Sequence, residues 1–460
     1  MDILSLLQET GQNIWIYGGA FIIVLSILVF VHEWGHYIVA RMCGVHVNMF
    51  SIGFGREVWG FNDKTGTRWK LSLIPLGGYV QLFGDTDPAS AGHSDSVEGD
   101  DGEVREMTQA EKEKAFFTKP LWQRAAVVFA GPAINYIFAI ILLTGLYVVH
   151  GKPVSPPTAA AVIGESSADK HGFMPHDIIV SIDGKPINSF GDIRREMMVA
   201  LDEERHFVIQ RGDERVDIHA RPERLAIEDR FGFKSSIGLL GLISAEQGIL
   251  ISRVTHVNGV AVDSPEAALI EIENRLDTTF MISMKRGDDT QNLTISPVSS
   301  MNQHLGTAPS VEEEALYLSN LPAKTYSAHT VMTAIQAAIN ETYVMTRSSL
   351  EALWQMVVGV RSATELGGII RIGAIAGDMA QQGLVPLILL MALLSINLGF
   401  INLLPIPMLD GGHLLFYFFE AVLGRPVPEQ FQEYAFRAGF FFLIGLMAFA
   451  NLNDLYQLLI

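Results

Sequence analysis

The stretch Ala20-Phe-Ile-Ile-Val-Leu-Ser-Ile-Leu-Val-Phe-Val-His32-Glu33-Trp-Gly-His36 decides how this chain folds. It lies within an apolar segment, residues 14–40, that is long enough to cross a bilayer as a helix of about 20 residues. On a helix, His32 and His36 lie about 40° apart, so both imidazoles can bind one zinc ion. Glu33 lies beside them and is suited to take a proton from a metal-bound water. Because ionisable groups inside a membrane are costly and usually functional, we expect a metal site here. The alternative, a polar helix end that reaches the interface, does not explain the spacing.

A zinc site needs a third protein ligand, and the best candidate is Asp410. It stands near the end of another apolar segment, in Asn402-Leu-Leu-Pro-Ile-Pro-Met-Leu-Asp410-Gly-Gly-His413. The two prolines break helical geometry and the Gly-Gly pair allows a sharp turn, so we expect Asp410 on irregular backbone. A carboxylate within or beside the bilayer needs a partner, which a cation held by two histidines supplies. His413 is the competing ligand, and a turn whose aspartate faces water is the other alternative.

The composition indicates membrane spans combined with soluble parts. Hydrophobic residues make up 49% of the 460, yet the chain has 32 Lys and Arg and 50 Asp and Glu. A net charge of −18 argues against nucleic acid as a partner, because phosphates would be repelled. The single cysteine, Cys43, excludes an internal disulfide.

Four segments have the length and apolarity of membrane spans: 14–40, 121–149, 384–404 and 434–456. Residues 1–40 contain no Lys or Arg, so we expect a retained helix rather than a cleaved signal peptide. Arg41, Lys119, Arg124 and Arg425 flank the spans, and basic residues beside short loops stay cytoplasmic. This places 41–120 in the cytoplasm, and both termini and residues 150–325 on the other side.

The regions between the spans have patterns of their own. Residues 67–83 alternate apolar and polar side chains around Gly77-Gly78, which predicts a β-hairpin, with a further strand at 51–55. Ile179-Val-Ser-Ile-Asp-Gly-Lys-Pro-Ile187 resembles Val254-Thr-His-Val-Asn-Gly-Val-Ala-Val262, which predicts two similar α+β modules. Helical spacing at 326–360 predicts an amphipathic helix near the membrane surface.

Together, His32-Glu33-x-x-His36 and Asn402-x-x-Pro-x-Pro-x-Leu-Asp410-Gly resemble the two motifs of the site-2 protease family of intramembrane metalloproteases. The resemblance covers nearly the whole chain. Its supporting marks are Gly53-Phe-Gly55, Gly77-Gly78-Tyr79 and Phe129-Ala-Gly-Pro-x-x-Asn135. The first two imply membrane-reentrant β structure that holds an unwound substrate strand, with Tyr79 and Asn402 near the bond to be cut.

The resemblance implies an α-helical polytopic membrane protein with four transmembrane helices, a membrane-associated β-hairpin region and two inserted α+β PDZ-like domains. We expect an N-terminal membrane half at 1–150 and a C-terminal membrane half at 380–460. Between them we expect PDZ-like domains at 155–225 and 226–300, and an interfacial helical segment at 320–375. The second PDZ-like domain is expected to be atypical, because its sequence lacks the small-residue and Gly-Asp marks of the first.

The implied function is a zinc-dependent endopeptidase, with one Zn²⁺ per chain held by His32, His36 and Asp410 and with Glu33 as general base. It would make the second cut in regulated intramembrane proteolysis of single-pass membrane proteins that are already trimmed, such as an anti-sigma factor or remnant signal peptides. The expected place is a bacterial inner membrane, with both termini and the PDZ-like domains periplasmic and the active site toward the cytoplasm. Two alternatives remain: a membrane-anchored zinc protease that cuts soluble or misfolded proteins, and a non-catalytic PDZ tether.

Overall fold

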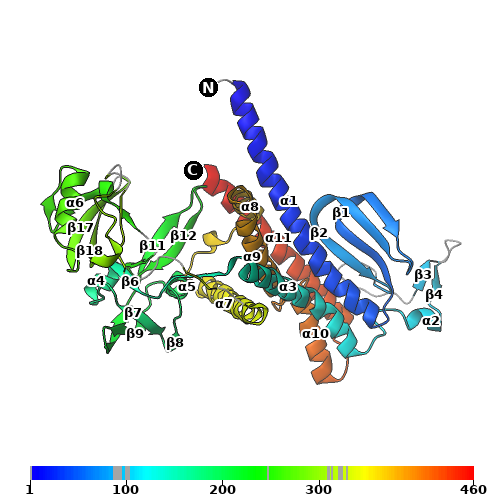
Figure 1. Cartoon of the computed structure of the whole chain (residues 1–460). Coiled ribbons are helices and arrows are strands. Elements are labelled where there is room, and N and C mark those ends of the chain that lie inside the picture. Colours follow the sequence, from blue (N-terminus) through cyan, green and yellow to red (C-terminus); the bar gives the residue numbers. More distant parts are fainter. Residues whose placement is uncertain are drawn as a thin grey trace. The chain divides into compact units, whose positions relative to one another are not determined.

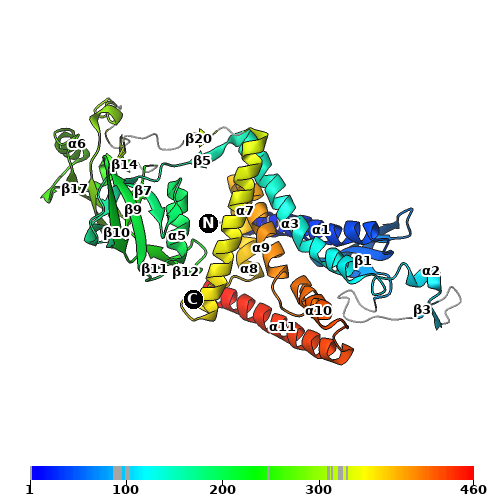
Figure 2. The ribbon, with the colours of Figure 1, turned by 90° about the horizontal axis from the view of Figure 1, so that it is seen from below.

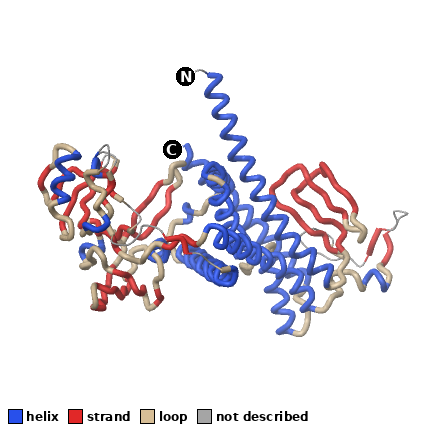
Figure 3. Tube along the Cα trace, in the orientation of Figure 1, coloured by secondary structure: helices blue, strands red, loops and turns tan. Residues whose placement is uncertain are grey.

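The computed structural model describes residues 3–85, 96–98, 104–245, 248–287, 289–307, 311, 314–319, 325–327 and 330–459. These residues form two compact units. Unit 1 comprises Met1–Val149, Thr330–Leu350 and Leu366–Ile460, and unit 2 comprises His150–His329 and Glu351–Glu365. Helices dominate unit 1 and strands dominate unit 2, as the colours of Figure 3 show.

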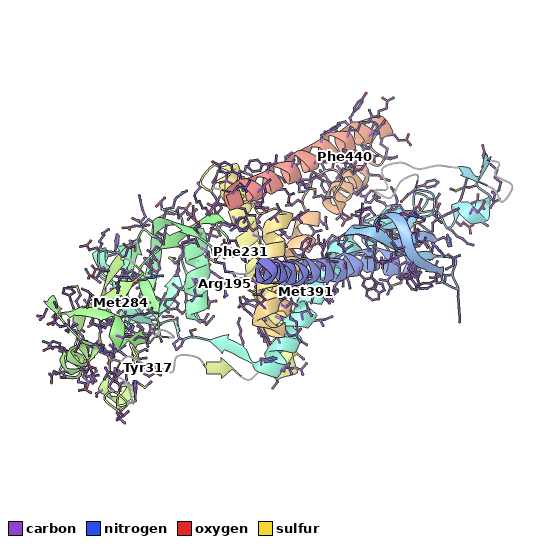
Figure 4. The ribbon with its side chains drawn as sticks, turned by 90° about the horizontal axis from the view of Figure 1, so that it is seen from above. Arg195, Phe231, Met284, Tyr317, Met391 and Phe440 are labelled. Carbon is purple, nitrogen blue, oxygen red and sulfur yellow. The ribbon has the colours of Figure 1, made fainter. Side chains whose placement is uncertain are left out.

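Unit 1 contains four helices that are long and apolar enough to cross a membrane. They are α1 (Ile3–Met42), of which Ile16–Met42 has this composition, α3 (Leu121–His150), α9 (Leu384–Asn402) and α11 (Glu429–Leu459) (Figure 1). Each coincides with one of the four predicted segments. On α11, Phe440 and its neighbours Phe441, Phe442 and Ile444 are 46–70% exposed (Figure 4). Such a row of exposed apolar side chains is what a lipid-facing helix requires.

The remaining helices of unit 1 are the short α2 (Gln109–Lys112), α8 (Ile369–Gln382), α10 (Asp410–Leu423) and the first part of α7 (Val331–Val357). Among them, α8 packs against α1, α9 and α11 (Figure 2). Helix α7 buries Ala334 and Ala338 against α3 and α9, and exposes Met332, Ile339 and Tyr343. A helix is present within the predicted range 326–360, and its amphipathic character and its place at a membrane surface stay predictions.

Helix α8 begins with backbone amides that its own sequence does not cap. Gly368 at the N-cap position offers no side chain, so α11 supplies the acceptors. Asp454 Oδ2 accepts from the amides of Gly368 and Arg371 at 2.9 Å each, and Asn451 Oδ1 accepts from Ile369 at 3.0 Å. Polar groups within a candidate membrane span therefore satisfy a helix end.

The β region of unit 1 is built from two long strands, β1 (Val47–Asn62) and β2 (Arg68–Leu82), with a short pair β3 (Ser96–Glu98) and β4 (Val104–Glu106). Residues 57–62 pair with 68–72, and 47–52 pair with 78–82. The hairpin turn lies at 63–67, where Asp63 Oδ1 accepts from the amides of Thr65 and Thr67. The chain also reverses direction between Leu71 and Gly78, because 68–71 and 78–81 both pair with residues 49–52 but run in opposite directions. Residues 49–52 therefore lie between the two halves of 67–83, which do not pair with each other as the predicted hairpin requires.

Unit 2 holds two groups of elements in the same order, β-β-α-β-β. The first consists of β7 (Ile178–Ile182), β8 (Lys185–Pro186), α5 (Phe190–Val199), β9 (Arg205–Arg211) and β10 (Glu214–Ala220). The second consists of β15 (Val254–Val257), β16 (Val260–Ala261), α6 (Pro265–Glu273), β17 (Phe280–Arg286) and β18 (Asp289–Ile295). Serine caps both helices, Ser189 on α5 and Ser264 on α6, and each group has its own buried apolar cluster.

One strand joins the two groups. Strand β6 (Ala159–Ile163), which the sequence assigned to the first PDZ-like domain, pairs with β18 of the second group and with β13 (Leu242–Ser244). The sheet that contains the strands of the second group therefore has the order β13-β6-β18-β17-β15-β16. The other elements of unit 2 are α4 (Ser167–Lys170) and the strands β5 (Lys152–Val154), β11 (Glu223–Glu228), β12 (Lys234–Leu239), β14 (Ile249–Leu250), β19 (Ala315–Leu316) and β20 (Thr325–Ser327).

Candidate metal centre

Three predicted ligand residues from two helices meet in unit 1. His32 and His36 lie one turn apart on α1, and Asp410 is the first residue of α10. One donor atom from each lies within 4.8 Å of the others. The two histidine Nε2 atoms are 3.3 Å apart, and Asp410 Oδ2 lies 3.3 Å from His32 Nε2 and 3.6 Å from His36 Nε2.

These separations fit a zinc ion. Bonds of about 2.0–2.1 Å to nitrogen and oxygen place the ligand atoms of a tetrahedral site about 3.3–3.4 Å apart. The side chains are only 11%, 14% and 18% exposed for His32, His36 and Asp410. Asp410 Oδ2 is buried and has no hydrogen-bond partner among the described residues. A buried carboxylate oxygen that faces two imidazole nitrogens needs a cation, which the donor set can hold.

Asp410 owes its place to the segment before it. Residues 403–409 are irregular, Met408 has the left-handed φ of 80°, and α10 begins at Asp410 itself. A Cβ at Gly411 would overlap the carbonyl of Leu404, and Gly412 is packed equally tightly against Ile406. The Gly-Gly pair therefore does not form the predicted turn. It lets the irregular segment fold back against the start of a regular helix, so the expectation of irregular backbone at Asp410 itself was wrong.

Helix α3 orients both imidazoles through contacts with their Nδ1 atoms. His36 Nδ1 donates to the carbonyl of Val127 at 2.9 Å, which leaves Nε2 as the lone-pair donor toward Asp410. His32 Nδ1 lies 3.0 Å from the side-chain amide of Asn135, a residue with no exposed surface whose Oδ1 has no partner among the described residues. With the amide turned, Oδ1 accepts from His32 Nδ1–H, which leaves His32 Nε2 free to bind a metal. Ser395 of α9 donates to the Asn135 carbonyl at 2.8 Å.

The close approach of α1 and α3 depends on two glycines. A Cβ at Gly131 would overlap the His36 ring and lie 2.9 Å from His32 Cε1. A Cβ at Gly35 would lie 2.5 Å from the carbonyl oxygen of Ala130. Gly131 and Asn135 belong to the motif Phe129–Asn135, but the motif predicted no role for either residue. The available signal was an amide side chain in the middle of an apolar span, where polar groups need partners.

Glu33 is not part of the donor set. Its carboxylate is hydrogen-bonded to the backbone of Val80 on β2. A Cβ at Gly78 would lie 3.3 Å from Glu33 Cγ and 2.6 Å from the carbonyl oxygen of Ser51. Glycine at 78 therefore allows β2 to lie directly against the glutamate.

A cavity of about 200 Å³ opens at the donor atoms. Its lining includes all three donor residues and Glu33, together with Gly78, Tyr79, Asn402 and His413. The Tyr79 hydroxyl donates to Met49 Sδ at 3.2 Å, and its ring stacks on Phe54. Asn402 is the last residue of α9. His413 packs on Phe436 and is outside the three-residue donor set.

The other predicted glycines shape the sheet and do not line the cavity. Gly53, Gly55 and Gly77 have left-handed φ angles of 88°, 87° and 109°. A Cβ at Gly53 would lie 2.6 Å from the carbonyl oxygen of Ile74, and one at Gly77 would lie 2.5 Å from the Phe54 ring. These three positions allow the bends that bring 78–82 to the cavity.

Comparison with known proteins matches residues 20–446 to the model of peptidase family M50. A relative from Mesorhizobium japonicum, whose name calls it a zinc metalloprotease, is 35% identical over 95% of this chain and 97% of its own length. A similarly named relative from Agrobacterium fabrum is 34% identical over 95% of both chains. The regulator of sigma E protease of Haemophilus influenzae is 31% identical over 96% of this chain and 98% of its own.

Proposed function

Because the chain belongs to peptidase family M50 and is a zinc metalloendopeptidase, we propose that it cuts membrane-spanning segments of other proteins. The proposed site is formed by four residues: His32, Glu33, His36 and Asp410. The observation that carries the proposal is that three donor atoms, two from α1 and one from the first residue of α10, lie within 4.8 Å of one another. The carboxylate oxygen among them is buried and has no hydrogen-bond partner among the described residues. Histidine and aspartate in a low-polarity site are zinc ligands, and three protein ligands leave one position open for chemistry.

Glu33 is the proposed general base. Zinc bound at this site supplies Lewis acidity, which polarises a carbonyl and lowers the pKa of water to about 7. The Glu33 carboxylate lines the same cavity without belonging to the donor set. It takes the proton of the attacking water and returns it to the leaving amine. The hydrogen bond from Val80 supports this role because it holds the carboxylate beside the donor atoms.

Strand β2 is the proposed binding edge for the substrate. A helical substrate hides its carbonyls, so the peptide must be extended before it can be cut. In the pairing of the described strands, 78–82 have partners on β1 only, and Gly78, Tyr79, Val80 and Leu82 line the cavity. A substrate strand added at this edge would lie beside Glu33. Asn402, the last residue of α9, lines the same cavity, and we propose that its amide hydrogen-bonds the substrate backbone or the developing oxyanion.

The proposed substrates are single-pass membrane proteins that another protease has already trimmed. His32, Glu33 and His36 lie within a candidate membrane helix, Ile16–Met42, which favours a transmembrane segment over a soluble protein. The name of the Haemophilus influenzae relative supports an anti-sigma factor as one class, and remnant signal peptides are another. The distribution of Lys and Arg supports an inner-membrane orientation with both termini and the PDZ-like domains periplasmic and the active site toward the cytoplasm.

The test is cleavage of trimmed single-pass proteins in membranes by the wild-type chain and by Glu33→Gln. Loss of a general base costs about 10²- to 10⁴-fold, and the variant should keep its zinc because Glu33 is no ligand. Turnover near the wild-type rate in Glu33→Gln would remove Glu33 from the mechanism. Cleavage of soluble proteins alone would replace the intramembrane function with that of a membrane-anchored protease.

A further inference from the structure

Arg124 and Glu420 form an ion pair between two helices of unit 1. Arg124 is in the first turn of α3 and Glu420 in the last turn of α10, and their Nη2 and Oε1 atoms are 2.5 Å apart. The side chains are 15% and 18% exposed. Arg124 also donates from Nε to the carbonyl of Lys119 at 3.2 Å, and its guanidinium lies 5.0 Å from the centre of the Tyr417 ring.

Neither charge is explained by its own helix. The N-terminus of a helix has a positive partial charge and the C-terminus a negative one. Arg124 is a cation near a helix N-terminus, and Glu420 is an anion near a helix C-terminus, so each helix disfavours the charge it carries. Both groups are also largely withdrawn from water, where a single unpaired charge is costly. Each charge therefore depends on the partner helix for its stability.

The two paired helices are the ones that build the metal centre. Helix α3 orients His36 through Val127 and His32 through Asn135, and α10 begins with Asp410. At 1.5 Å per residue, Arg124 lies about 5 Å along α3 from Val127, and Glu420 lies about 15 Å along α10 from Asp410. The ion pair and the donor atoms are thus two separate points at which α10 is held against the α1–α3 pair.

We propose that Arg124 and Glu420 are positioning residues that set the distance of Asp410 from the two histidines. The inference rests on the proposed zinc site. The donor separations of 3.3 and 3.6 Å already match a tetrahedral edge, so a sliding or tilting of α10 lengthens them and weakens metal binding. Fixing α10 at its far end prevents that motion. Without the pair, α10 keeps its apolar packing, with Leu414 and Tyr417 against the cluster that includes Val127 and with Phe416 on Phe436 of α11, but it loses its one charged link to α3 among the described residues.

The experiment measures metal binding by purified full-length protein. Arg124→Met and Glu420→Gln each remove one partner, and the double variant Arg124→Glu/Glu420→Arg restores the pair with the charges exchanged. The matched control is Arg437→Met, which removes the equally short but exposed Arg437–Glu433 pair on α11. Zinc affinity is measured by competition with a chelator, and the visible spectrum of the cobalt-substituted protein reports the geometry of the donor atoms.

Each single variant should bind zinc more weakly by up to about tenfold, the lower end of the range for groups that orient metal ligands, because neither residue touches a ligand directly. The cobalt spectrum should change in both. The exchanged pair should recover affinity and spectrum, and Arg437→Met should leave both unchanged.

If Arg124→Met does not fold, the result for Glu420→Gln, which keeps the size of the side chain, decides the question. Wild-type affinity and spectrum in a folded Glu420→Gln would overturn the inference, as would losses that the exchanged pair does not recover. If the wild type itself binds no zinc, the proposed function fails instead.

Discussion

The two sides of the metal centre are built in different ways. On one side, His32 and His36 come from a single regular helix, and their spacing alone brings both imidazoles to one point. On the other side, Asp410 comes from the start of a helix that follows irregular backbone, and its place depends on contacts with residues far away in the sequence. The helical side is a local property of five residues, whereas the aspartate side is a property of the whole unit.

This difference determines what each side tolerates. The histidines need room and orientation, which Gly131 and Asn135 of α3 supply. The aspartate needs its helix fixed in position. Substitutions at Gly131 and Asn135 should therefore weaken zinc binding through steric overlap and lost hydrogen bonds. Substitutions of cavity-lining residues outside the donor set should weaken substrate cleavage without changing zinc binding.

The largest effect is expected from Gly131→Ala. Its Cβ would overlap the His36 ring, which has no space to retreat because Val127 holds it from the other nitrogen. We expect zinc affinity to fall by about 100-fold or more, with proteolysis lost in parallel. The control is Gly145→Ala on the same helix, where a Cβ meets nothing within 4 Å. Equal zinc binding by the two variants would show that the α1–α3 contact is not as tight as described.

A smaller effect is expected from Asn135→Leu, which removes the acceptor for His32 Nδ1–H and leaves that donor buried. Zinc affinity should fall about tenfold, the lower end of the range for outer partners of metal ligands. Asn135→Asp keeps an acceptor at the same place and should bind zinc more tightly than the leucine variant. Chelator competition on the three proteins measures this, and indistinguishable affinities would exclude a role of Asn135 in orienting His32.

The sequence predicted the histidine side and the identity of the third ligand candidate, because helical periodicity and the cost of ionisable groups in a span are local arguments. It did not predict that Asp410 starts a helix, since the contacts of Gly411 with Leu404 are visible only in three dimensions. The assignment of 159–163 to the first PDZ-like domain missed its pairing with β18, because strand partners cannot be read from periodicity. The four candidate membrane helices among the described residues were predictable from composition alone.

The smallest effects are expected at the edge of the cavity. Tyr79→Ala and Asn402→Ala remove side chains that line the cavity without belonging to the donor set. Each should slow cleavage by up to about tenfold, the effect of one hydrogen bond of 0.5–1.5 kcal/mol, and zinc content should not change. Cleavage assays on several single-pass substrates measure this. Wild-type rates for both variants would exclude them from substrate binding, and loss of zinc in either would place it on the metal side instead.

The central claim, that one zinc ion joins the two sides, is tested most directly by elemental analysis of the purified protein and of its His32→Ala, His36→Ala and Asp410→Ala variants. We expect about one zinc per wild-type chain. We also expect a strong loss of zinc in every variant, including Asp410→Ala, although α1 keeps both histidines there. Full zinc retention in both His32→Ala and His36→Ala would contradict the site as a whole, and full retention in Asp410→Ala alone would contradict its aspartate side.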